Sequence, residues 1–200
     1  MKKVSIFLII FLLTFTSCNH PAKAKKLFNQ AVGIMDHSNL GDWMIGPTED
    51  TTKTLELLDE AIKLDPKWWN PYNQKIQIYK IGGYEENADK VKEVYDLWIS
   101  NENKLNYSSQ FSYACSLYCT GNETQASEMF SDFYSKYDGT GLKEEKKMIY
   151  IFSGIFLGKI NESNIRSIVI ERIDESLVPF LEEYVNEFKE NPKDAVWRYV

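Results

Sequence analysis

The chain has little of the side-chain chemistry on which most catalytic and metal sites depend. Its 200 residues include 2 His and 3 Cys, and no segment matches a zinc-protease, nucleophile-elbow or phosphate-loop motif. Its formal net charge is −6, which makes it a poor candidate for nucleic-acid binding, because that requires a dense basic surface. We therefore expect no catalytic residues, no metal site, no cofactor and no nucleic-acid partner.

Glycine and proline are scarce too, with 10 Gly and 6 Pro, whereas the chain has 12 Tyr, 11 Phe and 5 Trp. Few turn-forming residues favour long helices joined by short connections. A hydrophobic content of 44% is sufficient for one sizeable core or one short array of stacked units. The composition therefore predicts an all-α fold.

The first residues form a segment that we do not expect to belong to the folded domain. Lys2 and Lys3 precede an apolar run at residues 4–15. That run is too short to cross a bilayer comfortably, which takes roughly 20 apolar residues, but it has the length and charge pattern of a signal peptide. The sequence therefore predicts a signal peptide over residues 1–17.

This segment ends in FTSC, which resembles the lipobox of bacterial lipoproteins, where a small residue precedes an invariant cysteine. Ser17 and Cys18 match that pattern, and Phe15 stands where Leu is usual. The resemblance implies cleavage before Cys18, fatty acyl chains such as palmitate on that cysteine, and a short tether at residues 18–22. Several acyl chains anchor a protein stably where one does not, so we expect a membrane-held protein of the bacterial cell envelope that faces the periplasm or the exterior. The alternative is an uncleaved anchor with a chance cysteine.

The other two cysteines lie four residues apart. Cys115 and Cys119 would share one face of a helix, and their parallel Cβ vectors would disfavour a disulfide. A metal site would need further ligands, and the histidines are limited to His20 and His37. We expect buried free thiols, because free cysteine behaves as a small hydrophobic residue.

Apolar residues recur at helical spacing in the segment TLELLDEAIKLDP, residues 54–66, and Pro66 then ends the helix. Thr54, Leu58, Ala61 and Pro66 have the spacing of the second helix and closing turn of a tetratricopeptide repeat (TPR), which this segment resembles. The resemblance implies an all-α, TPR-like superhelical array of antiparallel helix pairs.

Two further units follow the order of a helix, a glycine-containing turn and a second helix. Gly82 and Gly83 break the first of these units, and Gly121 breaks the next, because glycine readily adopts the positive φ of a helix C-terminus. Equivalent positions recur with a period of about 33 to 39 residues, near the 34 expected for this repeat. We expect a domain over residues 23–200, with repeats at approximately 23–66, 68–101 and 105–138 and irregular helices over 142–200.

The match to the repeat is incomplete. Ile76 stands where a small residue is usual, and no proline closes the second unit. The helices of the first unit are separated by residues 37–50, which is too long for a repeat turn and contains the apolar Trp43, Met44 and Ile45. Long loops in compact domains are often functional.

Trp68 and Trp69 follow the helix-ending Pro66 almost directly. We expect both rings to be half-buried against the helix that has just ended, at the start of the next hairpin. The alternative is an aromatic platform for a ligand.

The TPR resemblance also implies that the first helix of each pair lines a concave surface. In the second unit the residues that would face it are Asn70, Asn73, Gln77 and Lys80. In the third unit they are Ser108, Phe111, Cys115 and Tyr118. Amides and a lysine beside aromatic rings suit an extended peptide, whose backbone pairs with the amides. The alternative is an ordinary solvated helix face.

These features together favour a non-enzymatic, membrane-anchored scaffold that binds a protein or peptide partner. One alternative is a glycan-binding accessory lipoprotein that stacks sugars on Trp43, Trp68 and Trp69. Another is a hydrolase too divergent for its motifs to be recognised, which would need a water-excluding pocket with a perturbed carboxylate.

Overall fold

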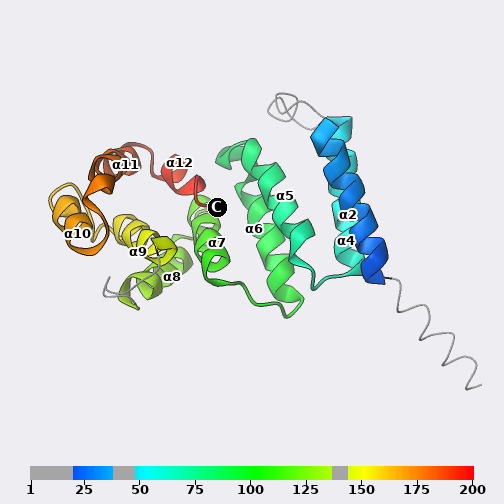
Figure 1. Cartoon of the computed structure of the whole chain (residues 1–200), viewed down its shortest axis with the longest axis horizontal. Helices are drawn as coiled ribbons and strands as arrows, with labels where there is room; N and C mark the ends of the chain where they lie inside the picture. Colours follow the sequence, from blue (N-terminus) through cyan, green and yellow to red (C-terminus); the bar gives the residue numbers. More distant parts are fainter. Residues whose placement is uncertain (1–19, 38–47, 137–143) are drawn as a thin grey trace, which may run out of the picture. The chain divides into compact units, whose positions relative to one another are not determined.

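The computed structural model describes residues 20–37, 48–136 and 144–200 (Figure 1). Within these ranges the chain forms ten α-helices and one short 3-10 helix, with no β-strand. The all-α prediction is therefore confirmed. The chain divides into two compact units, and the division passes through helix α6 (Tyr84–Ser100). Unit 1 contains the described residues up to Gly82 together with Val94–Asn103, and unit 2 contains Gly83–Glu93 and Lys104–Val200.

Unit 1 consists of α2 (His20–His37), α4 (Glu49–Leu64), α5 (Trp69–Ile81) and the C-terminal half of α6. Helix α2 begins at His20, three residues before the expected start of the domain at residue 23. It packs along α4, and α4 contacts α5 (Figure 1). The buried centre of this packing is made by Ala31, Leu58 and Ile78, one residue from each of the three helices. In each of the three helices, apolar residues recur at a spacing of three and four. They therefore share one face of their helix, and that face packs into this centre.

The junction between α4 and α5 is fixed by polar contacts to the carbonyl oxygen of Pro66. Tyr72 donates its hydroxyl to that oxygen at 3.1 Å, and Asn103 donates its side-chain amide at 2.8 Å. Tyr72 is fully buried, so this bond satisfies a polar atom that burial would otherwise penalise. The proline that ends α4 therefore also supplies the acceptor that holds the first turn of α5 in place.

Both tryptophans at this junction are half-buried, as predicted, and their rings meet aromatic rings of α2 and α6. The Trp68 ring lies 5.0 Å from the Phe28 ring on α2. The Trp69 ring lies 4.9 Å from the Trp98 ring on α6. Trp68 has extended backbone at the N-cap of α5, so it precedes the helix, and its ring meets a ring of α2.

Unit 2 begins with the first half of α6 and continues with α7 (Tyr107–Cys119), α8 (Glu123–Ser135) and α9 (Glu144–Phe156). It ends with α10 (Ile165–Arg172), the 3-10 helix η1 (Glu175–Leu177), α11 (Val178–Glu190) and α12 (Pro192–Trp197). Helix α8 lies between α7 and α9, α11 contacts α9, α10 and α12, and α12 contacts α7. The last helix thus returns to the beginning of the unit and closes its core.

The core of unit 2 is strongly aromatic. The Phe152 ring lies 4.1 Å from the Tyr199 ring and 5.0 Å from the Tyr184 ring, and Tyr184 donates its hydroxyl to the carbonyl of Ala195 at 2.8 Å. Aromatic rings bury large apolar areas and favour edge-to-face contacts. The last residues of α9, from Ile149 to Phe156, are all buried, which makes α9 the central helix of this unit.

The two central cysteines are buried free thiols, as predicted. Cys119 donates its thiol to the carbonyl of Lys193 at 3.6 Å. Burial is the main cause that raises the pKa of the Cys119 thiol to about 12, and the nearby Lys193 ammonium lowers it only in part. The thiol is therefore protonated at neutral pH.

Candidate functional site

The stripe predicted on α5 lies on the exposed side of that helix. Asn70, Asn73 and Gln77 are exposed, and Lys80 is half-buried. Their spacing of three and four residues keeps them on one face. The structure therefore brings the four residues together as one polar surface of unit 1, which we call the α5 stripe.

The other face of α5 explains why the stripe is well supported. Lys75 is buried, and its ammonium lies 2.5 Å from Asp59 Oδ1 on α4. The same ammonium lies 6.0 Å from the centre of the Tyr79 ring, within reach of a cation–π interaction. Because this face is fixed to α4, the stripe is presented on a helix that does not need a partner in order to pack.

Helix α7 does not present a matching surface. Phe111 is only 4% exposed, and its ring lies 5.9 Å from that of Phe130. Cys115 is buried, Ser108 is half-buried, and Tyr118 is half-buried with its ring 6.4 Å from that of Phe188. The expectation that Phe111 lines an open groove is corrected, because α7 is covered by α8 on one side and by α12 on another.

Two of the predicted features fall outside the described ranges. Cys18, the predicted site of lipid attachment, precedes α2, and Trp43 lies between α2 and α4 in the sequence. They stay predictions.

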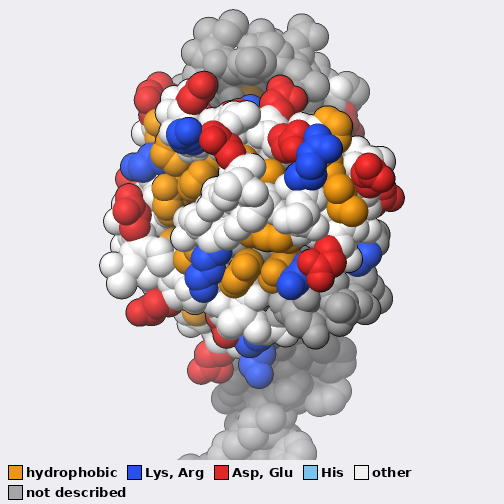
Figure 2. Space-filling model, turned by 90° about the vertical axis from the view of Figure 1, so that its left-hand side faces the viewer, with side chains coloured by type: hydrophobic (Ala, Val, Ile, Leu, Met, Phe, Trp, Pro, Cys, Tyr) orange, Lys and Arg blue, Asp and Glu red, His pale blue; other side chains and the backbone are white. Residues whose placement is uncertain are grey.

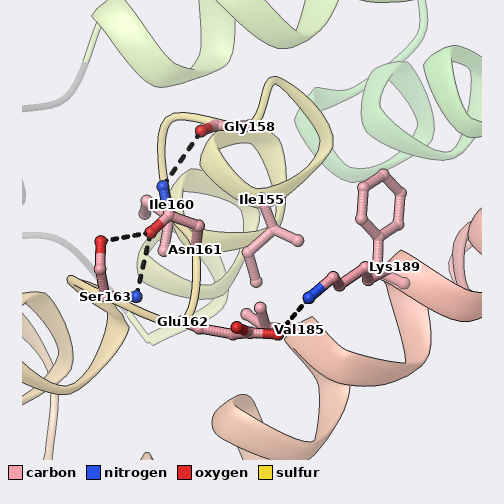
Figure 3. A pocket seen from close by; sticks show the side chains of 9 residues that line it. Ile155, Gly158, Ile160, Asn161, Glu162, Ser163, Val185 and Lys189 are labelled. Carbon is pink, nitrogen blue, oxygen red and sulfur yellow. Dashed lines mark hydrogen bonds and ion pairs between the residues drawn. The ribbon is translucent and has the colours of Figure 1, made fainter.

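The structure reveals a further candidate that sequence reasoning missed, an open pocket of about 550 Å³ in unit 2 (Figure 3). It lies between the C-terminal end of α9, the loop that joins α9 to α10, and α11. Ligand pockets in proteins commonly have volumes of roughly 300 to 1,000 Å³. The lining residues are Ile155, Gly158, Ile160, Asn161, Glu162, Ser163, Val185, Phe188 and Lys189.

The floor of the pocket is apolar. Ile155, Ile160 and Val185 are between 1% and 5% exposed, and Phe188 is half-buried. Val185 and Phe188 are three residues apart on α11, so both project from the same side of that helix. Well-buried aliphatic side chains give the floor a fixed shape, which suits an apolar group of a ligand.

The rim is polar and is organised by the side chain of Asn161. The Asn161 Oδ1 atom accepts a hydrogen bond from the Ser163 hydroxyl at 2.6 Å and another from the Ser163 backbone N–H at 3.0 Å. The Asn161 amide nitrogen donates to the carbonyl of Gly158 at 3.5 Å (Figure 3). This Asx-type turn holds the loop at the mouth of the pocket.

Two opposite charges meet across the rim. Lys189 Nζ on α11 lies 3.0 Å from Glu162 Oε1 on the loop (Figure 3). Their side chains are 72% and 54% exposed, so the pair contributes about 0 to 1 kcal/mol. A ligand can therefore replace one partner of this pair at low cost.

The loop itself follows from a glycine at the end of α9. Gly158 has φ of +69°, a conformation that residues with a Cβ rarely adopt. The backbone N–H groups of Lys159 and Ile160 both donate to the carbonyl of Gly154 at 2.9 Å, which closes the helix end. The glycine after an apolar helix was the available signal, but nothing in the sequence placed that helix end beside α11.

The pocket is better suited to binding than to catalysis. Its lining contains one carboxylate, one ammonium and no His or Cys, so it lacks the paired groups that general acid–base or nucleophilic catalysis uses. No cluster of three or more metal-ligating side chains occurs among the described residues. Within the same residues, no helix combines the length and apolar character needed to cross a membrane.

Unit 2 also has exposed hydrophobic residues that do not line the pocket. Ile170 on α10 and Phe180 on α11 are each 48% exposed, and Arg166 on α10 pairs with Glu182 on α11 at 3.1 Å. Figure 2 shows one face of the molecule, where hydrophobic patches are interrupted by charged side chains. Scattered exposed apolar residues are normal for folded proteins.

Comparison with known proteins adds no relative: no family model, no curated protein and no solved structure matches this chain significantly. The residues and their geometry therefore carry the functional interpretation.

Proposed function

We propose that this protein is a non-enzymatic scaffold of the bacterial cell envelope that binds a protein or peptide partner. The observation that carries the proposal is the α5 stripe. Its amide side chains are exposed on one face of a helix whose opposite face is fixed by buried contacts. A rigid helix with exposed amides can pair with the backbone of an extended segment at small entropic cost.

The proposal includes a membrane anchor. Cleavage before Cys18 and acylation of that cysteine would hold the mature chain at a membrane surface, two residues before the start of α2. In this arrangement the helical domain faces the periplasm or the cell exterior. The lipobox-like ending of the apolar segment supports this part of the proposal.

The proposal also includes a TPR-like array. Two short turns support it, because Gly83 between α5 and α6 and Gly121 between α7 and α8 both have φ of +80°. Each of these turns joins two helices of 13 to 17 residues. A helix, a glycine-containing turn and a second helix are the parts of which such an array is built.

Crosslinking in cells, read by mass spectrometry, tests the scaffold. The native protein is compared with the triple variant Asn73→Ala, Gln77→Ala, Lys80→Ala. The matched control changes Glu56, Glu60 and Lys63 to Ala, three exposed polar residues of α4 in the same unit. The proposal predicts a defined protein partner that is lost in the α5 variant and retained in the control.

Two outcomes would contradict the proposal. A partner retained by both variants would move the binding surface away from the α5 stripe. An absence of any protein crosslinked above background would contradict the scaffold itself and favour the glycan-binding alternative. A tryptophan fluorescence titration with oligosaccharides then tests that alternative directly.

A further inference from the structure

We infer that the pocket between the end of α9 and α11 binds the carboxyl-terminal residue of a peptide, with an apolar side chain in the floor and its terminal carboxylate at Lys189. This inference rests on the proposed peptide-binding function and adds the chemistry of the residue that is recognised. It uses groups of unit 2 alone.

The floor selects the side chain. Ile155, Ile160, Val185 and Phe188 offer aliphatic and aromatic surface without a polar atom. A polar side chain that entered would lose its hydrogen bonds to water without replacement, which is unfavourable. A side chain such as Leu, Met or Phe gains from leaving water.

The polar rim determines which charge on a ligand is favoured. A lysine ammonium has three donors, and the bond to Glu162 uses one of those of Lys189. The Asn161 amide has two donors, and its bond to Gly158 is long at 3.5 Å, whereas its oxygen already accepts two hydrogen bonds. The Lys189 ammonium and the Asn161 amide therefore keep spare donors, which complement a carboxylate, whereas Glu162 supplies the acceptors of the rim.

Glu162 is the group that opposes such a ligand. Its side chain is 54% exposed, so it can turn into water when a ligand carboxylate takes its place beside Lys189. In the protein without ligand, Glu162 occupies the Lys189 ammonium, so a ligand carboxylate has to displace it. Lys189 should therefore raise the affinity for the peptide, and Glu162 should lower it. An ion pair with a purely structural role would not produce these opposite effects.

The test measures fluorescence anisotropy with the purified full chain and labelled hexapeptides that end in Leu, Met or Phe. Each peptide is compared with the same peptide amidated at its carboxyl terminus and with one that ends in Ser. The inference predicts binding of at least one free-acid peptide and a loss of affinity of about fivefold or more on amidation or on change to Ser.

Three variants test the direction in which each charged residue changes the affinity for the peptide. Lys189→Gln is expected to weaken binding about fivefold, because a charged donor is removed. Glu162→Gln is expected to strengthen binding about twofold to fivefold, because the competing carboxylate is removed. Lys136→Gln is the matched control, since Lys136 is an exposed lysine of the same unit that pairs with Asp132 and does not line the pocket, and it is expected to change nothing.

The inference is overturned if no free-acid peptide binds, if amidation has no effect, or if Lys189→Gln and Glu162→Gln change affinity in the same direction. Tighter binding by octanoate than by every peptide would also overturn it and would assign the pocket to a fatty acid. The outcome is independent of the crosslinking test, because the variants of that test lie on α5 and α4 of unit 1.

Discussion

Lys75 is a lysine whose charge is largely shielded from water. Its side chain is 11% exposed, and its ammonium lies 2.5 Å from Asp59 Oδ1, whose side chain is 45% exposed. A buried ammonium that loses its partner keeps the desolvation penalty without the compensating attraction. This single contact therefore joins α4 to the helix that carries the proposed binding surface.

Removal of the Asp59 carboxylate should destabilise the protein. We expect Asp59→Ala to lower the free energy of unfolding by about 1–3 kcal/mol, measured by urea denaturation. The control is Asp132→Ala, whose ion pair with Lys136 is exposed on both sides; its effect should be below about 0.5 kcal/mol. Equal losses of stability in the two variants would show that the Lys75–Asp59 contact stabilises the protein no more than an exposed ion pair does.

The buried thiol of Cys119 makes the stability of the protein depend on pH. Its pKa is raised from 9.0 to about 12, mainly by burial. The unfolded thiol releases its proton first as pH rises, so the stabilisation from this group is present below about pH 9 and is lost between about pH 9 and pH 12. Buried Tyr184 acts in the same direction, because burial also raises the pKa of its phenol.

The free energy of unfolding should therefore fall between pH 9 and pH 11. The fall should be smaller in Cys119→Val, which has no thiol to ionise. Urea denaturation at several pH values measures both slopes. Identical slopes in the two proteins would contradict the assigned role of Cys119.

At the scale of helices, α9 shows how close packing constrains a single position. A Cβ atom at Gly154 would lie 2.6 Å from side-chain carbons of Ile160 and 2.8 Å from a ring carbon of Tyr134. Ile160 is 1% exposed, so it has little room to move. The close approach of the following loop to α9, which shapes the pocket floor, therefore requires glycine.

Two glycine-to-alanine changes should have opposite signs. We expect Gly154→Ala to destabilise unit 2 by about 1–3 kcal/mol through overpacking. Gly33→Ala on α2 meets no heavy atom within 4 Å, so it should stabilise the protein by about 0.4–1 kcal/mol through helix propensity and reduced unfolded-state entropy. Thermal and urea unfolding measure both, and a stabilising Gly154→Ala would contradict the packing described for α9.

The helices were largely predictable from sequence, whereas the pocket was not. Apolar periodicity, Pro66 and the turn glycines act locally, and they indicated the helices on either side of each break. The burial of Phe111 and the pocket depend on which helices meet in space. The return of α12 to α7 covers Phe111's helix, and the contact of α11 with α9 forms the pocket; neither contact has a local sequence signal.

At the scale of the whole molecule, the membrane anchor makes a separate prediction. If Cys18 carries acyl chains, the native protein should be found in the membrane fraction of cells, and Cys18→Ser should leave it unacylated, with the signal peptide uncleaved at that position. Labelling with a palmitate analogue and the mass of the mature protein test this. Unlabelled native protein would contradict the lipid anchor while leaving the α5 stripe untouched.

The central claim is that the protein binds a protein or peptide partner, because the proposed roles of the anchor and of the exposed α5 stripe both depend on that partner. The most direct measurement is the yield of the partner crosslink in cells for three proteins: native, the α5 variant and the α4 control. The account predicts one protein partner with the native chain, loss of that partner with the α5 variant, and its retention with the control. A partner yield that is equal in all three proteins, or no partner at all, would contradict the account.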